Sequence, residues 1–245
     1  MHDIGFVIFG CLTIPKYKEQ VLDAYATWVQ EALKSDCLVR FYVGDIPEDL
    51  DPVLKDLCIN VNEGDNYLSA MFKQWRGLED MSVEPCKWYM TCGTDTFVNV
   101  KNTLALLNNY DYTKKLLIGG AKGSEPIDGS AVEYFTGGAG IFLTSSVLED
   151  ILPKIADFIP WWMDCTLTPN TKIINDTLEV KYITAACDLQ LCYLCKDIEQ
   201  ISLPELLWGD RNYVGEGVNK DTLVTCHHMK HDDFYAYYRY VHPLN

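Results

Sequence analysis

One carboxylate, Asp95, directly follows an apolar segment that predicts a buried strand. Ligands of open α/β sheets bind at the carboxyl ends of strands, and a hard cation that bridges a diphosphate prefers carboxylate oxygens. Asp95 is therefore a candidate metal ligand. It is also a good capping residue for the helix that follows, because Asp accepts hydrogen bonds from the first N–H groups of a helix. The residues alone leave both interpretations open.

A cluster of small residues, Gly137-Gly138-Ala139-Gly140, indicates a close approach of the backbone to another group. It has neither the glycine spacing of a dinucleotide-binding motif nor the Lys-Ser/Thr pair of a P-loop. It is either a ligand-facing loop or a plain turn. The preceding Tyr134 and Phe135 favour the loop, since aromatic rings can stack on a sugar or enclose it.

Asp188 opens a predicted helix, in the sequence Cys187-Asp188-Leu189-Gln190. Such an Asp can simply stabilise the positive end of the helix dipole. At the mouth of a pocket, the same carboxylate can act as a general base on a hydroxyl group.

The segment Cys226-His227-His228 carries two adjacent histidines, whose side chains point apart in most backbones. One of them can then be a ligand while the other packs. Cys187, Cys192 and Cys195 elsewhere in the chain make a zinc site an alternative, but a single C-x-x-C at 192–195 inside an apolar helix is weak evidence for zinc. A solvated polar tail is the alternative.

Composition limits the class of protein. The chain of 245 residues has a net charge of −15, which argues against a nucleic-acid partner but allows a nucleotide whose phosphates are neutralised by a cation. Its ten cysteines lie mostly in or beside apolar runs, which favours reduced thiols. No apolar run is long enough to span a membrane and no signal peptide is visible, so the sequence as given predicts a soluble, cytoplasmic protein.

The elements that must position these residues alternate between apolar runs and helical patterns, which predicts an α/β fold with a mainly parallel sheet. The segment from Pro160 to Cys165, with Trp161 and Trp162, is expected to be irregular. We expect strands at Ile4–Phe9, Leu38–Val43, Cys58–Val61, Lys87–Cys92, Leu116–Gly119 and Val132–Thr136, and helices at Tyr17–Leu33, Asn66–Leu78, Val98–Leu107, Ser145–Ile155 and Asp188–Asp197.

In order and spacing, these segments resemble the Fringe and core-1 β-galactosyltransferase family of inverting glycosyltransferases over most of the chain. The glycine segment is close to the family's Tyr-x-Ser-Gly-Gly-Ala-Gly signature and is the most specific match. The other segments that resemble the family are Ala26-Thr27-Trp28, Asn66 to Trp75, Trp88 to Val98, Leu117 to Gly120, Cys187 to Leu191 and Thr225 to His228.

The resemblance implies a GT-A fold, a Rossmann-like mixed sheet flanked by helices in a single compact domain over residues 1–245. Residues 1–120 would form the nucleotide-sugar-binding half and residues 121–245 the acceptor-binding half. It implies a metal-dependent hexosyltransferase that moves a sugar from a UDP-sugar to a hydroxyl group of a glycan or glycoprotein. Asp188 would be the catalytic base, and Asp95 and His227 would hold Mn²⁺ or Mg²⁺, with His228 one residue away.

The resemblance also implies substrate contacts and a compartment. Substrate would be bound by Tyr134, Phe135, Gly137, Gly138, Ala139, Gly140, Trp161 and Trp162. Lys73, Arg76 or Lys230 could add positive charge near the diphosphate, although the sequence does not position them. Relatives of this type work in the secretory lumen behind a membrane anchor, which would apply here if the sequence is part of a longer protein.

The sequence departs from the family at the metal. Gly93 and Thr94 stand where the family has its first two acids, and Cys187 replaces the Glu before the base. A non-catalytic module that binds a nucleotide sugar or a glycan on the same fold is therefore an alternative. A Cys/His zinc protein and a retaining GT-A transferase also remain open.

Overall fold

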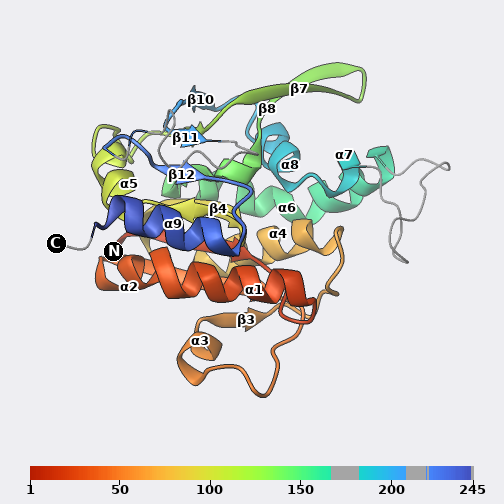
Figure 1. The fold of residues 1–245 in the computed structure, drawn as a ribbon. Helices are drawn as coiled ribbons and strands as arrows, with labels where there is room; N and C mark the ends of the chain where they lie inside the picture. The colour runs from red at the N-terminus through yellow and green to blue at the C-terminus, as the bar shows by residue number, and fades with distance from the viewer. Residues whose placement is uncertain (167–181, 208–218, 220, 244–245) are drawn as a thin grey trace.

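The computed structural model describes residues 1–166, 182–207, 219 and 221–243. It has the α/β architecture that the alternating pattern predicts, with a mixed sheet of seven strands at its centre (Figure 1). The strands of this sheet are β1 (His2–Phe9), β2 (Cys37–Val43), β3 (Cys58–Asn60), β4 (Cys86–Gly93), β6 (Leu116–Gly119), β9 (Ile141–Thr144) and β10 (Glu199–Ser202).

The order of the strands is β10-β6-β9-β4-β1-β2-β3. Strand β1 pairs in parallel with both β2 and β4, and β3 continues in parallel beyond β2. Strand β9 lies antiparallel between β4 and β6. Because Phe9 is paired with Gly93 at the end of β1, the loops that follow β1 and β4 leave the sheet side by side.

Helices cover both faces of the sheet, because its strands are apolar on both sides. Trp28 and Tyr237 belong to the core on one face, and Trp75 and Ile151 to the core on the other. The first face carries α1 (Pro15–Ala24), a π-helical segment (Tyr25–Val29), α2 (Gln30–Lys34), α5 (Val100–Leu107) and α9 (His231–Val241), and the second carries α4 (Ser69–Met81), α6 (Ser145–Thr166) and α8 (Cys187–Leu194).

Smaller elements complete the fold. A second sheet has the order β11-β12-β5, and a hairpin of β7 and β8 extends away from the body above α8 (Figure 1). These elements are β5 (Phe97–Val98), β11 (Leu206–Leu207), β12 (Thr225–Cys226), β7 (Lys122–Ile127), β8 (Ser130–Phe135), the 3₁₀ helix η2 (Gly137–Ala139), α3 (Pro52–Asp56) and α7 (Tyr182–Ala185).

Two expectations are wrong. The passage from Pro160 to Cys165 is helical, because α6 continues through Pro153 and Pro160 as far as Thr166. The helix expected at Val98 begins two residues later, since Phe97–Val98 pairs as a strand. All ten cysteines are free thiols, and Cys11, Cys37, Cys58 and Cys92 are buried. Within the described residues, none of the helices combines the length and apolarity that crossing a bilayer requires.

Candidate active site

Asp95 lies just beyond the carboxyl end of β4, and its side chain is 29% exposed. It does not cap the following helix. Asn99 is the residue before α5, and its side chain accepts a hydrogen bond from the backbone N–H of Asn102. The carboxylate of Asp95 is therefore available for another role at the sheet edge.

His227 comes to Asp95 through the small sheet. Strand β12 pairs antiparallel with β5, with Cys226 opposite Phe97, and this pairing places the residue after β12 beside the residues before β5. The backbone N–H of Met229 donates to the carbonyl oxygen of Asp95 at 2.9 Å. As a result, His227 Nε2 lies 3.4 Å from Asp95 Oδ1.

His228 joins the same cluster, which the sequence did not predict. Its φ of 61° is in the left-handed region, where residues other than glycine are uncommon. This backbone conformation folds its ring against that of His227, with the centroids 3.8 Å apart, so the expectation that the two rings point apart is wrong. One ligand atom each from Asp95, His227 and His228 lies within 4.8 Å of the others.

The donor set fits a divalent cation. One carboxylate oxygen and two imidazole nitrogens can bind Mn²⁺, for which carboxylates are favoured ligands. Burial raises the pKa of Asp95, but the hydrogen bond and charge of His227 and the charge of His228 outweigh it, so its pKa lies below its ordinary value. The carboxylate is therefore ionised, as a metal ligand must be.

The glycine segment forms η2 and is fastened from two sides. Thr96 donates its hydroxyl hydrogen bond to the carbonyl oxygen of Gly138, and Thr225 donates to that of Ala139. A Cβ atom at Gly138 would lie far inside 3.0 Å of the His227 ring, a separation that real Cβ atoms essentially never show. Gly140 has a φ of 85°, which favours glycine.

Asp188 lies against the same loop from the side of α8. Its Oδ2 accepts from the N–H of Gly137 at 2.9 Å, and its Oδ1 accepts from the N–H of Leu189 at 2.8 Å. A Cβ atom at Gly137 would overlap Asp188. Burial raises the pKa of Asp188, although the two N–H groups oppose that change, and a raised pKa suits a carboxylate that must accept a proton.

The two positions that lack the family's acids lie beside Asp95. A Cβ atom at Gly93 would be 3.0 Å from Asp95 Oδ1, so this position faces the candidate metal ligand. Thr94 is only 5% exposed, and its hydroxyl donates to Gln20 Oε1 on α1 at 3.2 Å. Thr94 therefore faces α1 rather than the metal cluster.

The four aromatic candidates lie in different surroundings. Phe135 and Trp162 are fully buried and Tyr134 nearly so, which leaves little of their surface for a ligand. The indole N–H of Trp162 donates to the carbonyl oxygen of Thr184. Trp161 is 36% exposed and stacks on the ring of Tyr193.

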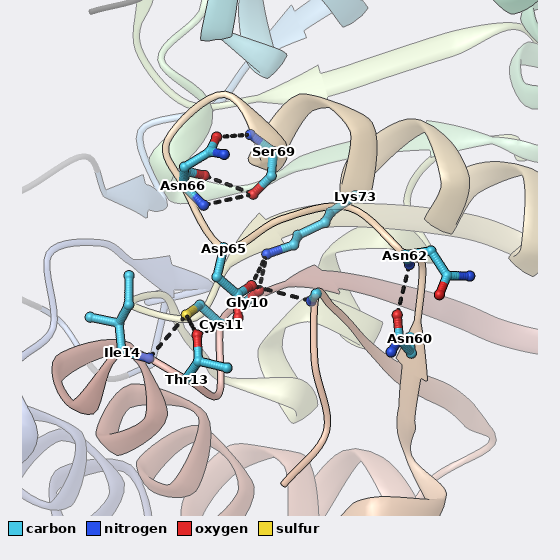
Figure 2. Close-up of polar contacts among 11 residues, drawn as sticks. Gly10, Cys11, Thr13, Ile14, Asn60, Asn62, Asp65, Asn66, Ser69 and Lys73 are labelled. Atoms are coloured by element: carbon cyan, nitrogen blue, oxygen red, sulfur yellow. Dashed lines mark hydrogen bonds and ion pairs between the residues drawn. The ribbon is translucent and has the colours of Figure 1, made fainter. Parts of the chain in front are cut away.

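A second polar cluster ties together the loops at the carboxyl ends of β1 and β2 (Figure 2). Lys73 donates to Asp65 Oδ1 at 2.5 Å and to the carbonyl oxygen of Gly10 at 2.8 Å. Asp65 also accepts from the hydroxyl of Thr13 and from the N–H of Gly44. The ammonium of Lys73 is thus buried and committed to this cluster, away from solvent.

The sequence also suggested Arg76 as a cation for the diphosphate and a zinc site at the cysteines near α8. Arg76 pairs with Glu79 on the surface of α4. Among the residues that the structure describes, the cluster of Asp95 and the two histidines is the one group of three or more His, Cys, Asp or Glu side chains suited to a metal. Cys187, Cys192 and Cys195 do not belong to it, so the described residues bring none of these three cysteines together with the two histidines.

The central sheet, with a carboxylate after β4 and helices on both faces, defines the GT-A class of glycosyltransferase folds. The glycosyltransferase GlyE of Streptococcus pneumoniae TIGR4 shares this fold with a TM-score of 0.54 and 12% identity; the alignment covers 100% of this chain and 61% of that one. A glycosyltransferase involved in the glycosylation of the major capsid of PBCV-1 has 13% identity and a TM-score of 0.44, with 97% and 98% coverage. The galactosyltransferase LgtC, solved with donor and acceptor sugar analogs, has 10% identity and a TM-score of 0.47, with 92% and 86% coverage.

Residues 7–187 match the family model described as Fringe-like, so the chain belongs to the Fringe-like family. The match includes Asp95 and the glycine segment and ends at Cys187, the residue before Asp188. No curated protein matches the chain in sequence.

Proposed function

We propose that this protein transfers a sugar from a UDP-sugar to an acceptor hydroxyl group by a metal-assisted, inverting displacement. The observation that carries the proposal is the contact of two adjacent glycines with two different functional groups. Gly137 packs against Asp188, and Gly138 packs against His227. One short loop thus contacts a candidate base on one side and a candidate metal cluster on the other.

In the proposed reaction, the acceptor oxygen forms a bond to the anomeric carbon while the bond from that carbon to the diphosphate oxygen breaks. The acceptor's proton passes to the carboxylate of Asp188, and UDP leaves with the bonding electron pair. The N–H groups of Gly137 and Leu189 fix the orientation of Asp188, so that its carboxylate is held in place before the acceptor arrives.

The second requirement is a sink for the charge of the leaving group. A Mn²⁺ or Mg²⁺ ion held by Asp95 and His227 would offset the negative charge that develops on the diphosphate. His228 is placed to contribute a further nitrogen. Because the chain has one carboxylate here instead of three, the phosphates of the donor would supply part of the coordination, and the ion should bind more weakly without nucleotide.

The proposal is tested by titrating UDP into the full chain with and without Mn²⁺, together with an assay of UDP release from a panel of UDP-sugars. We expect UDP to bind more tightly with Mn²⁺, and at least one UDP-sugar to be turned over. Binding of UDP that is indifferent to Mn²⁺ would contradict the metal site.

A non-catalytic binding module is the second candidate, and Gly93 and Thr94 are the observation that favours it. The missing carboxylates reduce the charge available to hold a cation beside the diphosphate. This candidate predicts measurable UDP binding without release of UDP from any common UDP-sugar.

The anomeric configuration of the product would separate an inverting from a retaining reaction.

A further inference from the structure

A pocket of about 420 Å³ lies between the β7–β8 hairpin and the end of α8. Its volume is within the range of small-molecule sites. The hairpin contributes Ser130 and Glu133, and the helix side contributes Tyr193 and Lys196. The pocket contains none of the residues of the candidate active site.

Aromatic stacking supports one wall of this pocket. The ring of Tyr193 is half-buried and stacks on Trp161, with the centroids 5.1 Å apart and the planes at 30°. Phe158 stacks on the same ring at 6.0 Å. Lys196 Nζ lies 5.0 Å from the centre of the Tyr193 ring. The ring is thus held in place by its neighbours.

The pocket lies farther along α8 than the candidate active site. Gly137 contacts Asp188, and the N–H of Phe135 donates to Cys192 Sγ at 3.4 Å, so β8 and α8 run in opposite directions past each other. Tyr193 is five residues beyond Asp188, which corresponds to about 8 Å along the helix. Figure 1 shows the hairpin extending above α8.

The chemistry of the lining suits a carbohydrate. The C–H face of a pyranose ring packs on an aromatic side chain, while its hydroxyl groups bond to charged and polar side chains. The part of the Tyr193 ring that lines the pocket offers an aromatic surface, and Ser130, Glu133 and Lys196 offer a hydroxyl, a carboxylate and an ammonium group. Glu133 and Lys196 are both exposed at the pocket and can be reached from solvent.

We infer that this pocket binds a distal sugar of the acceptor, so that the acceptor is an oligosaccharide chain rather than a single sugar. The inference rests on the proposed function, because it takes Asp188, five residues before Tyr193 on α8, as the base. An acceptor longer than one sugar would place its reacting hydroxyl at Asp188 and a second ring at Tyr193.

The test uses a printed glycan array that runs from monosaccharides to longer chains, probed with the full chain in the presence of UDP and Mn²⁺. The best-bound glycan and its terminal monosaccharide are then titrated against wild type and two variants. Ser130→Trp fills the pocket from an exposed position, and Val83→Trp adds the same side chain to an exposed position outside the hairpin that does not line the pocket.

We expect the longer glycan to bind more tightly than its terminal monosaccharide, and Ser130→Trp to lower that affinity at least about tenfold. Val83→Trp should bind like wild type. Lys196→Ala, at an exposed position that lines the pocket, is a second variant and should also weaken binding of the longer glycan.

Three results would overturn the inference: no glycan bound by wild type, no preference for the longer chain, or an unchanged affinity in Ser130→Trp. Hydrolysis of the donor, measured as release of UDP without an acceptor, distinguishes a failure of this inference from a failure of the proposed function. Ser130→Trp should release UDP at the wild-type rate, and a wild type that releases none would count against the catalytic proposal instead.

Discussion

Replacing one of two adjacent glycines by alanine should disable a different part of the site in each case. A Cβ atom at Gly138 would overlap the His227 ring, which would have to withdraw by about 1 Å to restore an ordinary contact of 3.4 Å. The ring is confined on its other sides by His228 and Asp95. Metal–ligand distances tolerate only about 0.2 Å, so Gly138→Ala should remove His227 from the metal.

Loss of a positioning contact around a metal ligand weakens metal binding by about 10–100-fold. The Mn²⁺ concentration that half-restores UDP binding in Gly138→Ala should therefore rise by that factor. In Gly137→Ala the new Cβ meets Asp188, so the Mn²⁺ dependence should stay as in wild type while turnover falls by about 100-fold.

The assay is calorimetric titration of UDP at a series of Mn²⁺ concentrations, paired with UDP release from a donor. Gly64→Ala is the matched control, since a Cβ there would meet Asn66 Nδ2 no closer than 3.4 Å. Overpacking alone costs about 1–3 kcal/mol of stability, so thermal melting must show that each variant is folded. If Gly138→Ala kept the wild-type Mn²⁺ dependence, His227 would not be a metal ligand.

Four further substitutions are informative. Asp188→Asn should abolish transfer and leave UDP affinity nearly intact; retained turnover would remove Asp188 as the base. Asp95→Ala should make UDP binding independent of Mn²⁺, whereas an unchanged Mn²⁺ dependence in calorimetry would leave Asp95 without a metal role. Gly93→Asp adds a carboxylate beside Asp95 and should tighten Mn²⁺ binding, and a weaker site in the same titration would argue against a shared ion. Lys73→Met leaves the Asp65 carboxylate buried and should cost about 3–5 kcal/mol at neutral pH in denaturant melts. Burial alone would raise the pKa of Asp65, but the hydrogen bonds from Lys73 and Thr13 lower it below its ordinary 3.8. The paired carboxylate therefore stabilises the fold above pH 3.8, and this stabilisation is lost as the pH falls through the lowered pKa. The difference between wild type and Lys73→Met should shrink there; a difference that does not change with pH would contradict this pairing.

Much of the sheet could be predicted from the sequence, because its strands are apolar runs bounded by polar segments. Strands β1, β2 and β4 lie within a residue or two of the expected positions. The glycine segment was also identified, since a run of small residues between apolar stretches is unusual. The structure places it between Asp188 and His227.

Tertiary pairing explains what the sequence did not reveal. Strands of two residues, such as Phe97–Val98 and Thr225–Cys226, are too short to produce a periodic pattern, yet they bring His227 to Asp95. His228 reaches the cluster because its own backbone is in the left-handed region, a conformation that no local pattern predicts. The helix around Trp162 persists despite Pro160, because Trp162 packs fully in the core and donates to Thr184.

The pocket beside Tyr193 was missed for a related reason. Tyr193 looks like an ordinary apolar position of a helix, and Glu133 like an exposed residue of a strand. Only the antiparallel passage of β8 along α8 puts the two residues around one hollow. The sequence pointed instead to Trp162 and Phe135, which the structure buries.

The most direct test of the central claim is the release of UDP from UDP-sugars by the full chain, measured with Mn²⁺ and with the metal removed by a chelator. We expect at least one UDP-sugar to release UDP with Mn²⁺, and the rate to fall to background without it. UDP that binds the chain while no UDP-sugar is turned over, with or without Mn²⁺, would contradict the claim and identify a binding module on this fold.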